Sequence, residues 1–254
     1  MTPAGPPNLD LGRIKVLYER AEQRYLRALP LEHFMESTTQ ATQRKITVES
    51  FDLIHVSRPD VQCFNELLVQ YPPPGGDLDK PGQVVPDNMV VIHPRPIVAD
   101  GSYMTPLQPV GPFLVIEYVS KASVRKDAEV SYEKYERELK VPYYLLFYSD
   151  ADELTLFRLG EEGYVTTRPN ANGRYPIPEL EVEVALLGDW VRYWFRGELL
   201  PLPGDLLKER DAERKARLAA EKQAETERQA RQAAEAEIAK LRAELAKVKG
   251  DGAA

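Results

Sequence analysis

The chain has 254 residues, of which 43% are hydrophobic and 29% are charged, and its net charge at pH 7 is −7. This length suits one sizeable globular domain with an appendage. The acidic balance excludes a protein that coats nucleic acid with its whole surface, so nucleic-acid binding would require a local basic patch. No apolar run approaches the roughly 20 residues that a membrane-spanning helix needs.

The cysteine content and the N-terminal sequence favour a cytoplasmic protein. Cys63 is the single cysteine, so no disulfide can form within the chain, as expected in a reducing compartment. The first twenty residues lack the basic start and apolar stretch of a secretory signal. A small structural residue is the favoured interpretation of Cys63, ahead of a nucleophile.

The first part of the chain predicts two helices. An N-terminal extension, 1–30, begins with prolines and continues into the helical stretch LGRIKVLYERAEQRYLRAL. A second helix is expected in MESTTQATQRKITVESFDLIHVSRPD, where Ser37, Thr38 and Thr39 offer N-cap oxygens and Arg58-Pro59-Asp60 ends the pattern.

The middle of the chain alternates apolar strands with loops and one helix. Four stretches are strands by composition: 61–71, 87–93, 113–120 and 141–148. Helical periodicity runs from about 124 to 140, with Ser131, Tyr135 and Leu139 on one face. The order strand, strand, helix, strand predicts an α/β layer with a crossover helix. A hairpin is expected around Gly160 to Gly163.

The last part of the chain changes character. The segment 180–200 predicts a strand and a short aromatic helix that close the domain. From 203 to 249 nearly all residues are strong helix formers. Near its end, four apolar residues are spaced as in a coiled-coil seam: Ile238, Leu241, Leu245 and Val248. A solvated helix and a coiled coil that makes a homodimer both stay open. The predicted domains are the extension 1–30, a core domain 31–202, the charged helix 203–249 and a disordered tail 250–254.

Glu117 does not fit the pattern of its strand. Both faces of this strand are otherwise apolar, and an unpaired buried charge costs several kcal/mol or more. An ion pair, a bound proton or a cation would each remove that cost. Asp87 begins the preceding strand with no helix between, so the two carboxylates converge if the strands are neighbours. A divalent cation would then relieve their repulsion, and oxygen ligands of this kind suit Mg²⁺. The alternative is an ion pair with a nearby Arg or Lys.

Other chemistries have less support in the sequence. The three histidines, His33, His55 and His93, are scattered and have no cysteine cluster beside them, which argues against a zinc site. A Gly-rich phosphate loop and a Gly-x-Ser-x-Gly elbow are both missing from the sequence. A glycosidase with paired carboxylates is formally open, but the sequence suggests no sugar-stacking groove.

Several segments together resemble a known family. The order VVPDNMVVI, then PFLVIEYVS, then a charged helix running into YERELKVPYYLLF resembles the Uma-type family of restriction-endonuclease-like proteins, a branch of the PD-(D/E)XK nuclease superfamily. The resemblance covers roughly 35–187. It implies a restriction-endonuclease-like mixed sheet flanked by helices, and hydrolysis of DNA phosphodiesters that depends on Mg²⁺ or Mn²⁺. It also implies that Asp87 and Glu117 are catalytic residues that bind the metal ion.

The resemblance draws in two further acidic residues. Glu36, in HFMES, falls where the family usually has a glutamate ahead of its first core helix. A helix-entry acid stabilised by the helix dipole is an equally good interpretation. Glu66, in FNELL, is a similar acid on a predicted strand.

The chain departs from the family pattern at the lysine. The superfamily places a lysine two residues after the glutamate, where this chain has Val119. The Uma-type family instead usually carries it on the following helix, at the position of Ser131, four residues before Tyr135. Lys126 and Lys134 are the nearest candidates to substitute, although each is also explained as a solvated surface lysine. Losing this group typically costs on the order of a hundredfold in rate.

Two hypotheses follow from the sequence. The first is a metal-dependent DNA endonuclease, a phosphodiester hydrolase that Ser131 would make slow. The second is a catalytically degenerate nuclease-fold protein that acts as an interaction or DNA-binding module through its coiled coil. Target specificity and biological role are not encoded in any recognisable motif.

Overall fold

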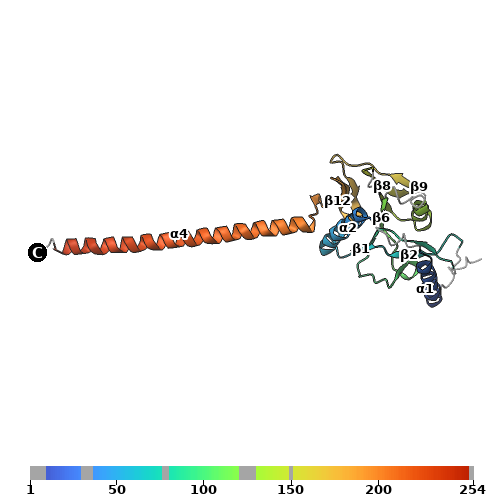
Figure 1. Cartoon of the computed structure of the whole chain (residues 1–254), viewed down its shortest axis with the longest axis horizontal. Helices are drawn as coiled ribbons and strands as arrows, with labels where there is room; N and C mark the ends of the chain where they lie inside the picture. Colours follow the sequence, from blue (N-terminus) through green and yellow to red (C-terminus); the bar gives the residue numbers. More distant parts are fainter. Residues whose placement is uncertain (1–9, 30–36, 76–79, 120–129, 149–150, 252–254) are drawn as a thin grey trace, which may run out of the picture. The chain divides into compact units, whose positions relative to one another are not determined.

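The computed structural model describes residues 10–29, 37–75, 80–119, 130–148 and 151–251 (Figure 1). The chain divides into two compact units, one ending at Leu200 and one beginning at Pro201. The candidate functional residues all belong to the first unit.

A six-stranded sheet forms the centre of the first unit, with its strands in the order β1-β4-β6-β7-β8-β9. These strands are β1 (Val61–Asn65), β4 (Asn88–Ile92), β6 (Leu114–Val119), β7 (Tyr143–Tyr148), β8 (Glu153–Gly160) and β9 (Gly163–Thr166). β6 and β7 run parallel, whereas every other neighbouring pair is antiparallel. The predicted α/β class with a mixed sheet and flanking helices is confirmed.

One face of the central sheet is covered by helix α2 (Thr38–Ser57) and by a four-stranded antiparallel sheet. That second sheet consists of β10 (Tyr175–Ile177), β11 (Val182–Leu187), β12 (Trp190–Phe195) and β13 (Glu198–Leu199), with the short η4 turn (Pro178–Leu180) after β10. Phe51 of α2 and Tyr193 of β12 are fully buried here and join the residues of β6 at even positions, such as Ile116. This is the largest of the three hydrophobic cores in the described part of the chain.

The opposite face is covered by a three-stranded sheet and by a short helical turn. The sheet has the order β3-β2-β5, with β2 (Leu68–Tyr71), β3 (Gly82–Val84) and β5 (Ser102–Met104), and the η2 turn (Thr105–Leu107) follows β5. The helical turn is η3 (Lys134–Glu138), a π-helix. Val115 of β6 and Tyr135 of η3 are buried in the same core. Helix α1 (Leu11–Ala28) packs on this layer through Ile14 and Tyr18, which contact Met104.

Capping residues explain where the two helices begin. Asp10 accepts hydrogen bonds from the backbone N–H groups of Gly12 and Arg13 at the start of α1. Ser37 accepts from the Gln40 backbone N–H, and the Gln40 side chain accepts from the Ser37 N–H, which completes a capping box for α2. The predicted N-cap of the second helix is therefore confirmed.

Two sequence-based predictions of secondary structure are wrong. The stretch 61–71 is not one strand, because the backbone turns at Glu66, whose φ is 47°. β1 and β2 consequently join different sheets. The expected aromatic helix near 190–195 is strand β12, which pairs with β11 across a turn at Gly188, where φ is 63°. Tryptophans four residues apart lie on one face of a strand as well as of a helix, so their spacing could not separate the two.

Two other predictions concern a hairpin and a helix. The hairpin between β8 and β9 is confirmed, with Gly160 opposite Gly163. The expected helix 124–140 lies only partly within the described residues, where 130–133 are α-helical and η3 follows.

A buried hydrogen-bond network ties α2 to both sheets that it covers. The Gln43 side chain accepts from the Val191 N–H at 2.8 Å and donates to the Val191 carbonyl at 3.1 Å. The Thr47 hydroxyl contacts the hydroxyls of both Tyr118 and Tyr193. Because β13 pairs only with the last residues of β12, Gln43 satisfies backbone groups that would otherwise be buried without partners.

The second unit is the single helix α4 (Pro203–Asp251). The side chains described on it are nearly all exposed, and pairs such as Arg217 with Glu221 (3.0 Å) lie along its surface. Ile238 of the predicted seam is half exposed, while the side chains of Leu241, Leu245 and Val248 lie outside the described part. Within the described residues, no helix is both long and apolar enough to cross a membrane.

Candidate active site

The pairing of β4 with β6 brings the two predicted carboxylates face to face. These antiparallel strands pair Asn88 with Ile116 and Met89 with Val115. Continuing the same register by one residue places Asp87 opposite Glu117. Directly opposed residues have Cβ atoms about 4.5–5.5 Å apart on the same face of a sheet. The sequence-based expectation that the two strands are neighbours is confirmed.

The Asp87 side chain takes the place of a backbone hydrogen-bond acceptor where the pairing of β4 with β6 stops. Its Oδ2 atom accepts a hydrogen bond from the Tyr118 backbone N–H at 2.7 Å. Pro86 precedes Asp87 and has no N–H of its own to continue a ladder. The side chain of Asp87 is therefore fixed by the backbone of the strand that carries Glu117.

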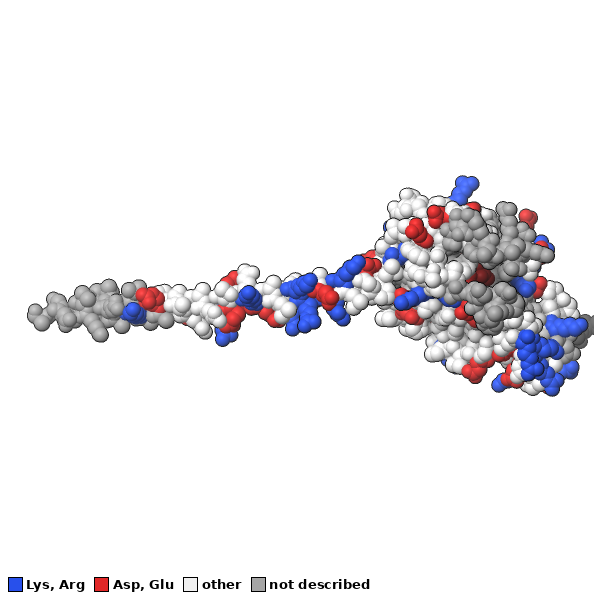
Figure 2. Space-filling model, in the orientation of Figure 1, with Lys and Arg blue, Asp and Glu red and all other residues white. Residues whose placement is uncertain are grey.

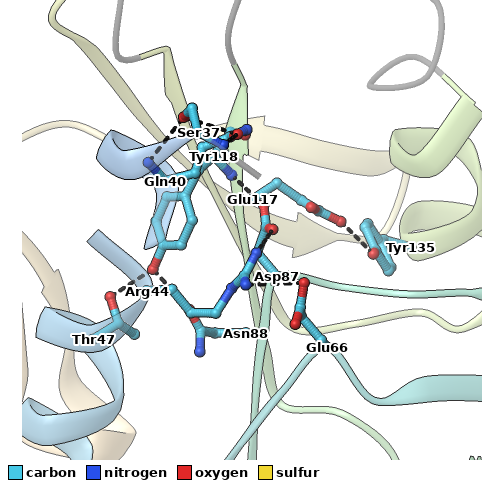
Figure 3. Close-up of polar contacts among 10 residues, drawn as sticks. All are labelled: Ser37, Gln40, Arg44, Thr47, Glu66, Asp87, Asn88, Glu117, Tyr118 and Tyr135. Atoms are coloured by element: carbon cyan, nitrogen blue, oxygen red, sulfur yellow. Dashed lines mark hydrogen bonds and ion pairs between the residues drawn. The ribbon is translucent and has the colours of Figure 1, made fainter. Parts of the chain in front are cut away.

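Arg44 of α2 supplies the positive charge at this site (Figure 3). Its guanidinium donates to Asp87 Oδ1 at 3.1 Å and pairs with Glu66 Oε1 at 2.9 Å. The side chains of Arg44 and Asp87 are only 12% and 20% exposed, whereas that of Glu66 is 54% exposed. Charge pairs weaken as they become exposed to water, so the bond to Asp87 is the stronger of the two.

Glu117 is held by a tyrosine instead of a basic residue. The Tyr135 hydroxyl donates to Glu117 Oε1 at 2.6 Å. Burial and the neighbouring carboxylate raise the pKa of Tyr135, so this hydroxyl keeps its proton and acts as the donor. Burial and then the negative charge of Asp87 raise the pKa of Glu117 well above its usual range, although the Tyr135 hydrogen bond opposes this rise.

The residues next to the two carboxylates anchor the strands from the opposite face of the sheet. The Tyr118 hydroxyl donates to Asn88 Oδ1 at 2.9 Å and also contacts the Thr47 hydroxyl. Asn88 and Tyr118 are both buried. Slipping one strand by a residue would break this network and turn every side chain to the other face. The network therefore fixes the register that opposes Asp87 and Glu117.

The other predicted site residues lie in different surroundings. Glu66 is brought to the site through Arg44, as described above. The Lys134 ammonium donates to the Gln83 carbonyl of β3 at 2.8 Å. Ser131 lies one turn before Tyr135 and is partly buried. Glu36 and Lys126 lie outside the described residues.

Sequence reasoning missed the roles of Arg44 and Tyr135. A signal for Arg44 was present, because Arg44, Thr47, Phe51 and Ile54 recur at helical spacing and the last three are buried. Arg44 thus stands at the end of the inward stripe of α2. Tyr135 was placed on the inward face of its helix, but nothing in the sequence pointed to Glu117 as its partner. Its position on a π-helical turn is typical of functional sites.

The site offers two carboxylates to a cation. Among the described residues, no group of three or more His, Cys, Asp or Glu side chains could hold a metal ion. Mg²⁺ usually keeps several waters and uses only one or two protein carboxylates together with substrate phosphates. The pair therefore fits the ligand demand of Mg²⁺, and the pKa of Glu117 is raised first by burial and then by the negative charge of Asp87, which a cation would offset.

The first unit has a mixed sheet, and two acidic residues oppose each other at one end of its central strands. This arrangement indicates a nuclease-like α/β protein. Residues 35–187 match the Uma2 family, which is described as "Putative restriction endonuclease". The match covers more than half of the chain, and the protein belongs to this family.

Two further comparisons were made. A crystal structure described as "a putative nuclease belonging to DUF820" from Anabaena variabilis is 15% identical, with a TM-score of 0.43, and the alignment covers 57% of this chain and 75% of that one. No curated protein matches the chain.

The substitution Glu117→Gln should stabilise the metal-free protein at neutral and alkaline pH, by on the order of 1 kcal/mol. Because the folded-state pKa of Glu117 is raised, the wild type loses stability as the pH rises from about 4.3, the ordinary glutamate value, through that folded-state pKa. Glutamine does not titrate and can still accept the Tyr135 hydrogen bond. Denaturant unfolding in chelator at pH 4 and pH 8 would measure the difference.

The difference between Glu117→Gln and wild type should shrink toward pH 4, where Glu117 is protonated in both the folded and the unfolded chain. The exposed Glu198 of β13 provides a control, since Glu198→Gln should show little pH-dependent difference. A Glu117→Gln variant that is less stable than wild type at pH 8 would contradict the like-charge account of this pair.

Proposed function

We propose that the protein is a DNA endonuclease that hydrolyses phosphodiester bonds with the help of Mg²⁺, for which Mn²⁺ can substitute. The observation that carries this proposal is the opposition of Asp87 and Glu117 in the register of β4 and β6. Membership of a family described as restriction endonucleases supports the same reaction class and DNA as the substrate.

Asp87 and Glu117 would hold the metal ion. Each carboxylate oxygen has two lone pairs, so the bonds to Arg44 and to the Tyr118 N–H leave acceptor capacity on Asp87. Such an ion, when bound, polarises a phosphoryl oxygen and lowers the pKa of a water molecule. Asp87 and Glu117 are therefore assigned as metal ligands and catalytic residues.

Arg44 and Tyr135 act on these two ligands. Arg44 fixes the orientation of Asp87 and partly offsets its charge, while the second amino group of the guanidinium is occupied by Glu66. Tyr135 orients Glu117 through one carboxylate oxygen. Both are positioning residues, because their polar atoms are directed at protein carboxylates and not at the substrate. Glu66 and Glu36 are kept as additional acids of lower rank.

The site lacks the positive charge that the family lysine would supply. Ser131 occupies the family position, and the Lys134 ammonium is engaged by the Gln83 carbonyl. Lys134 would have to leave that carbonyl in order to assist catalysis, and Lys126 is the other candidate. We therefore expect a slow nuclease.

The serine at the family lysine position also favours the second hypothesis, a catalytically degenerate nuclease-fold protein that acts as an interaction or DNA-binding module. On that view α4 is the assembly element, which pairs with a second copy as a coiled coil and makes a homodimer. Exposed apolar residues such as Leu218 and Ile238 on α4 support a partner for this helix. A cytoplasmic location, which rests on the single cysteine, is part of both proposals.

Supercoiled plasmid should be nicked in Mg²⁺ and not in chelator, and both Glu117→Ala and Asp87→Asn should lower the rate by at least a hundredfold. The physical reason is that each substitution removes a ligand of the ion that stabilises charge on the reacting phosphate. Gel quantitation of nicked plasmid measures the rate, and calorimetric titration with Mn²⁺ measures ion binding separately.

The control for these variants is Glu198→Ala, which removes an exposed acid elsewhere in the same unit and should nick at the wild-type rate. Persistent nicking by purified Glu117→Ala would reject the assignment of Glu117. Ion binding without any nicking by the wild type would instead favour the degenerate protein.

Restoring the family lysine with Ser131→Lys should raise the nicking rate by at least tenfold. Ser131 and Tyr135 are four residues apart, so a lysine there lies on the same side of the helical segment as the hydroxyl that binds Glu117. Lys134→Met provides the complementary test and should lower the wild-type rate if Lys134 substitutes. An unchanged rate in Ser131→Lys would point to a site that lacks more than this group.

Analytical ultracentrifugation should give a dimer for the full chain and a monomer for a chain ending at residue 202. The expected change in mass follows from removing α4, the helix whose apolar seam would pair with its copy. Far-ultraviolet circular dichroism of the shortened chain serves as the folding control. Identical monomeric masses for the two chains would remove the homodimer proposal.

A further inference from the structure

Helix α1 carries a concentration of positive charge that contrasts with the net charge of −7 for the whole chain. Four arginines of this helix, here named the arginine stripe, are Arg13, Arg20, Arg24 and Arg27. All four are exposed. Figure 2 shows Lys and Arg side chains gathered over α1 on the face in view. The helix precedes the residues matched by the family model, so the family assigns it no role.

The spacing of the arginines places them in one line along the helix. They follow one another at intervals of seven, four and three residues, which at 100° per residue keeps them within an arc of roughly 60°. At 1.5 Å per residue, the stripe from Arg13 to Arg27 is about 21 Å long. A single DNA strand presents about six phosphates over that length of helix axis.

The acidic residues of α1 do not neutralise the stripe. Glu19 lies 3.9 Å from Lys15, and Glu22 accepts a hydrogen bond from the Ser102 hydroxyl at 2.9 Å. By helical spacing Glu22 lies about 140° or more from every arginine of the stripe, and Glu19 lies about 80° from the nearest, Arg27. In the described part of the chain, no ion pair is found for Arg13, Arg20 or Arg27, so their charge faces solvent.

The stripe is presented on a helix that is fixed to the domain. Ile14, Tyr18 and Ala21 are at most 5% exposed and form the buried side, about 120° around the helix from the stripe. The Gln70 side chain of β2 donates to the Tyr18 carbonyl at 3.1 Å. A docked helix holds its charges in fixed positions, which lowers the entropy cost of binding a regular array of phosphates.

Strand β2 connects this helix to the candidate active site. Glu66, which pairs with Arg44, is four residues before Gln70. Four residues of extended chain span at most about 14 Å, which is the length of about four base pairs along the axis of DNA. β2 therefore joins the layer that carries α1 to the chain segment that begins at Glu66, beside the candidate site.

We propose that the arginine stripe binds the phosphate backbone of duplex DNA, the substrate of the proposed function. This inference rests on the proposed function for its choice of duplex DNA as the partner. Arginine suits the role because its guanidinium binds phosphate oxygens in pairs and stays charged at any physiological pH. The contact is with the backbone, so it is independent of sequence.

The test uses a fluorescent 30-base-pair duplex and the full chain in chelator, where no cleavage occurs. The triple variant Arg13→Gln/Arg20→Gln/Arg27→Gln should bind at least tenfold more weakly than wild type at 100 mM salt. Each lost phosphate contact lowers the slope of log K against log salt by about 0.9, so the slope should fall by about 2.7. Fluorescence anisotropy across a salt series measures both quantities.

The charge-matched control is Lys45→Gln/Arg95→Gln/Arg168→Gln, which removes three exposed positive charges elsewhere in the first unit and should leave the affinity unchanged. Equal weakening by the two triple variants, or an unchanged salt slope in the α1 variant, would overturn the proposal. So would loss of binding to phosphatidylserine vesicles in the α1 variant with unchanged DNA affinity, which would assign the stripe to a membrane surface.

The outcome for the stripe is separable from the outcome for catalysis. Wild-type binding with the expected slope change, but without any cleavage, would support the stripe and reject the endonuclease. Circular dichroism of the α1 variant, which changes only exposed side chains, controls for folding.

Discussion

The antiparallel register of β4 and β6 is the constraint on which the candidate site depends. It places Asp87 directly opposite Glu117 on one face of the sheet. On the other face, Asn88, Tyr118 and Thr47 form a buried hydrogen-bonded network that tolerates no slip of one strand against the other. An interaction that stabilises the fold therefore also imposes the proximity of two like charges, which is unfavourable unless a proton or a cation is bound.

The surroundings of the two carboxylates are not symmetric. Asp87 receives a guanidinium and a backbone N–H, so its charged form is well solvated by the protein. Among the described residues, Glu117 receives the Tyr135 hydroxyl and lies beside Asp87, and burial followed by the negative charge of Asp87 raises its pKa. Retaining a poorly compensated glutamate in a central strand costs stability, and such costs are typically kept where function needs them.

The sequence offered an ion pair with Arg or Lys as the alternative explanation for a buried acid. Arg44 provides such an ion pair for Asp87, but not for Glu117. Glu117, the residue that prompted the question, has no basic partner among the described residues. The Arg44 ion pair accounts for Asp87, whereas among the described residues Glu117 has a tyrosine hydroxyl and a carboxyl neighbour, and a bound proton would also remove its charge. An oxygen-liganded cation accounts for both, which is why the proposed function rests on the pair and not on either residue alone.

The sequence by itself determined strands β4, β6 and β7, the two helices of the first unit, the N-cap of α2 and the family, because periodicity, N-cap residues and the order of motifs are local properties. It also singled out Asp87 and Glu117, since an acid in an apolar strand is visible without coordinates. Only the tertiary structure decided that Arg44 serves Asp87 and that Tyr135 serves Glu117. It also showed the break at Glu66 that sends β1 and β2 into different sheets. Those contacts join segments 18 to 43 residues apart, and the packing of the sheet, not local spacing, selects which distant side chains meet.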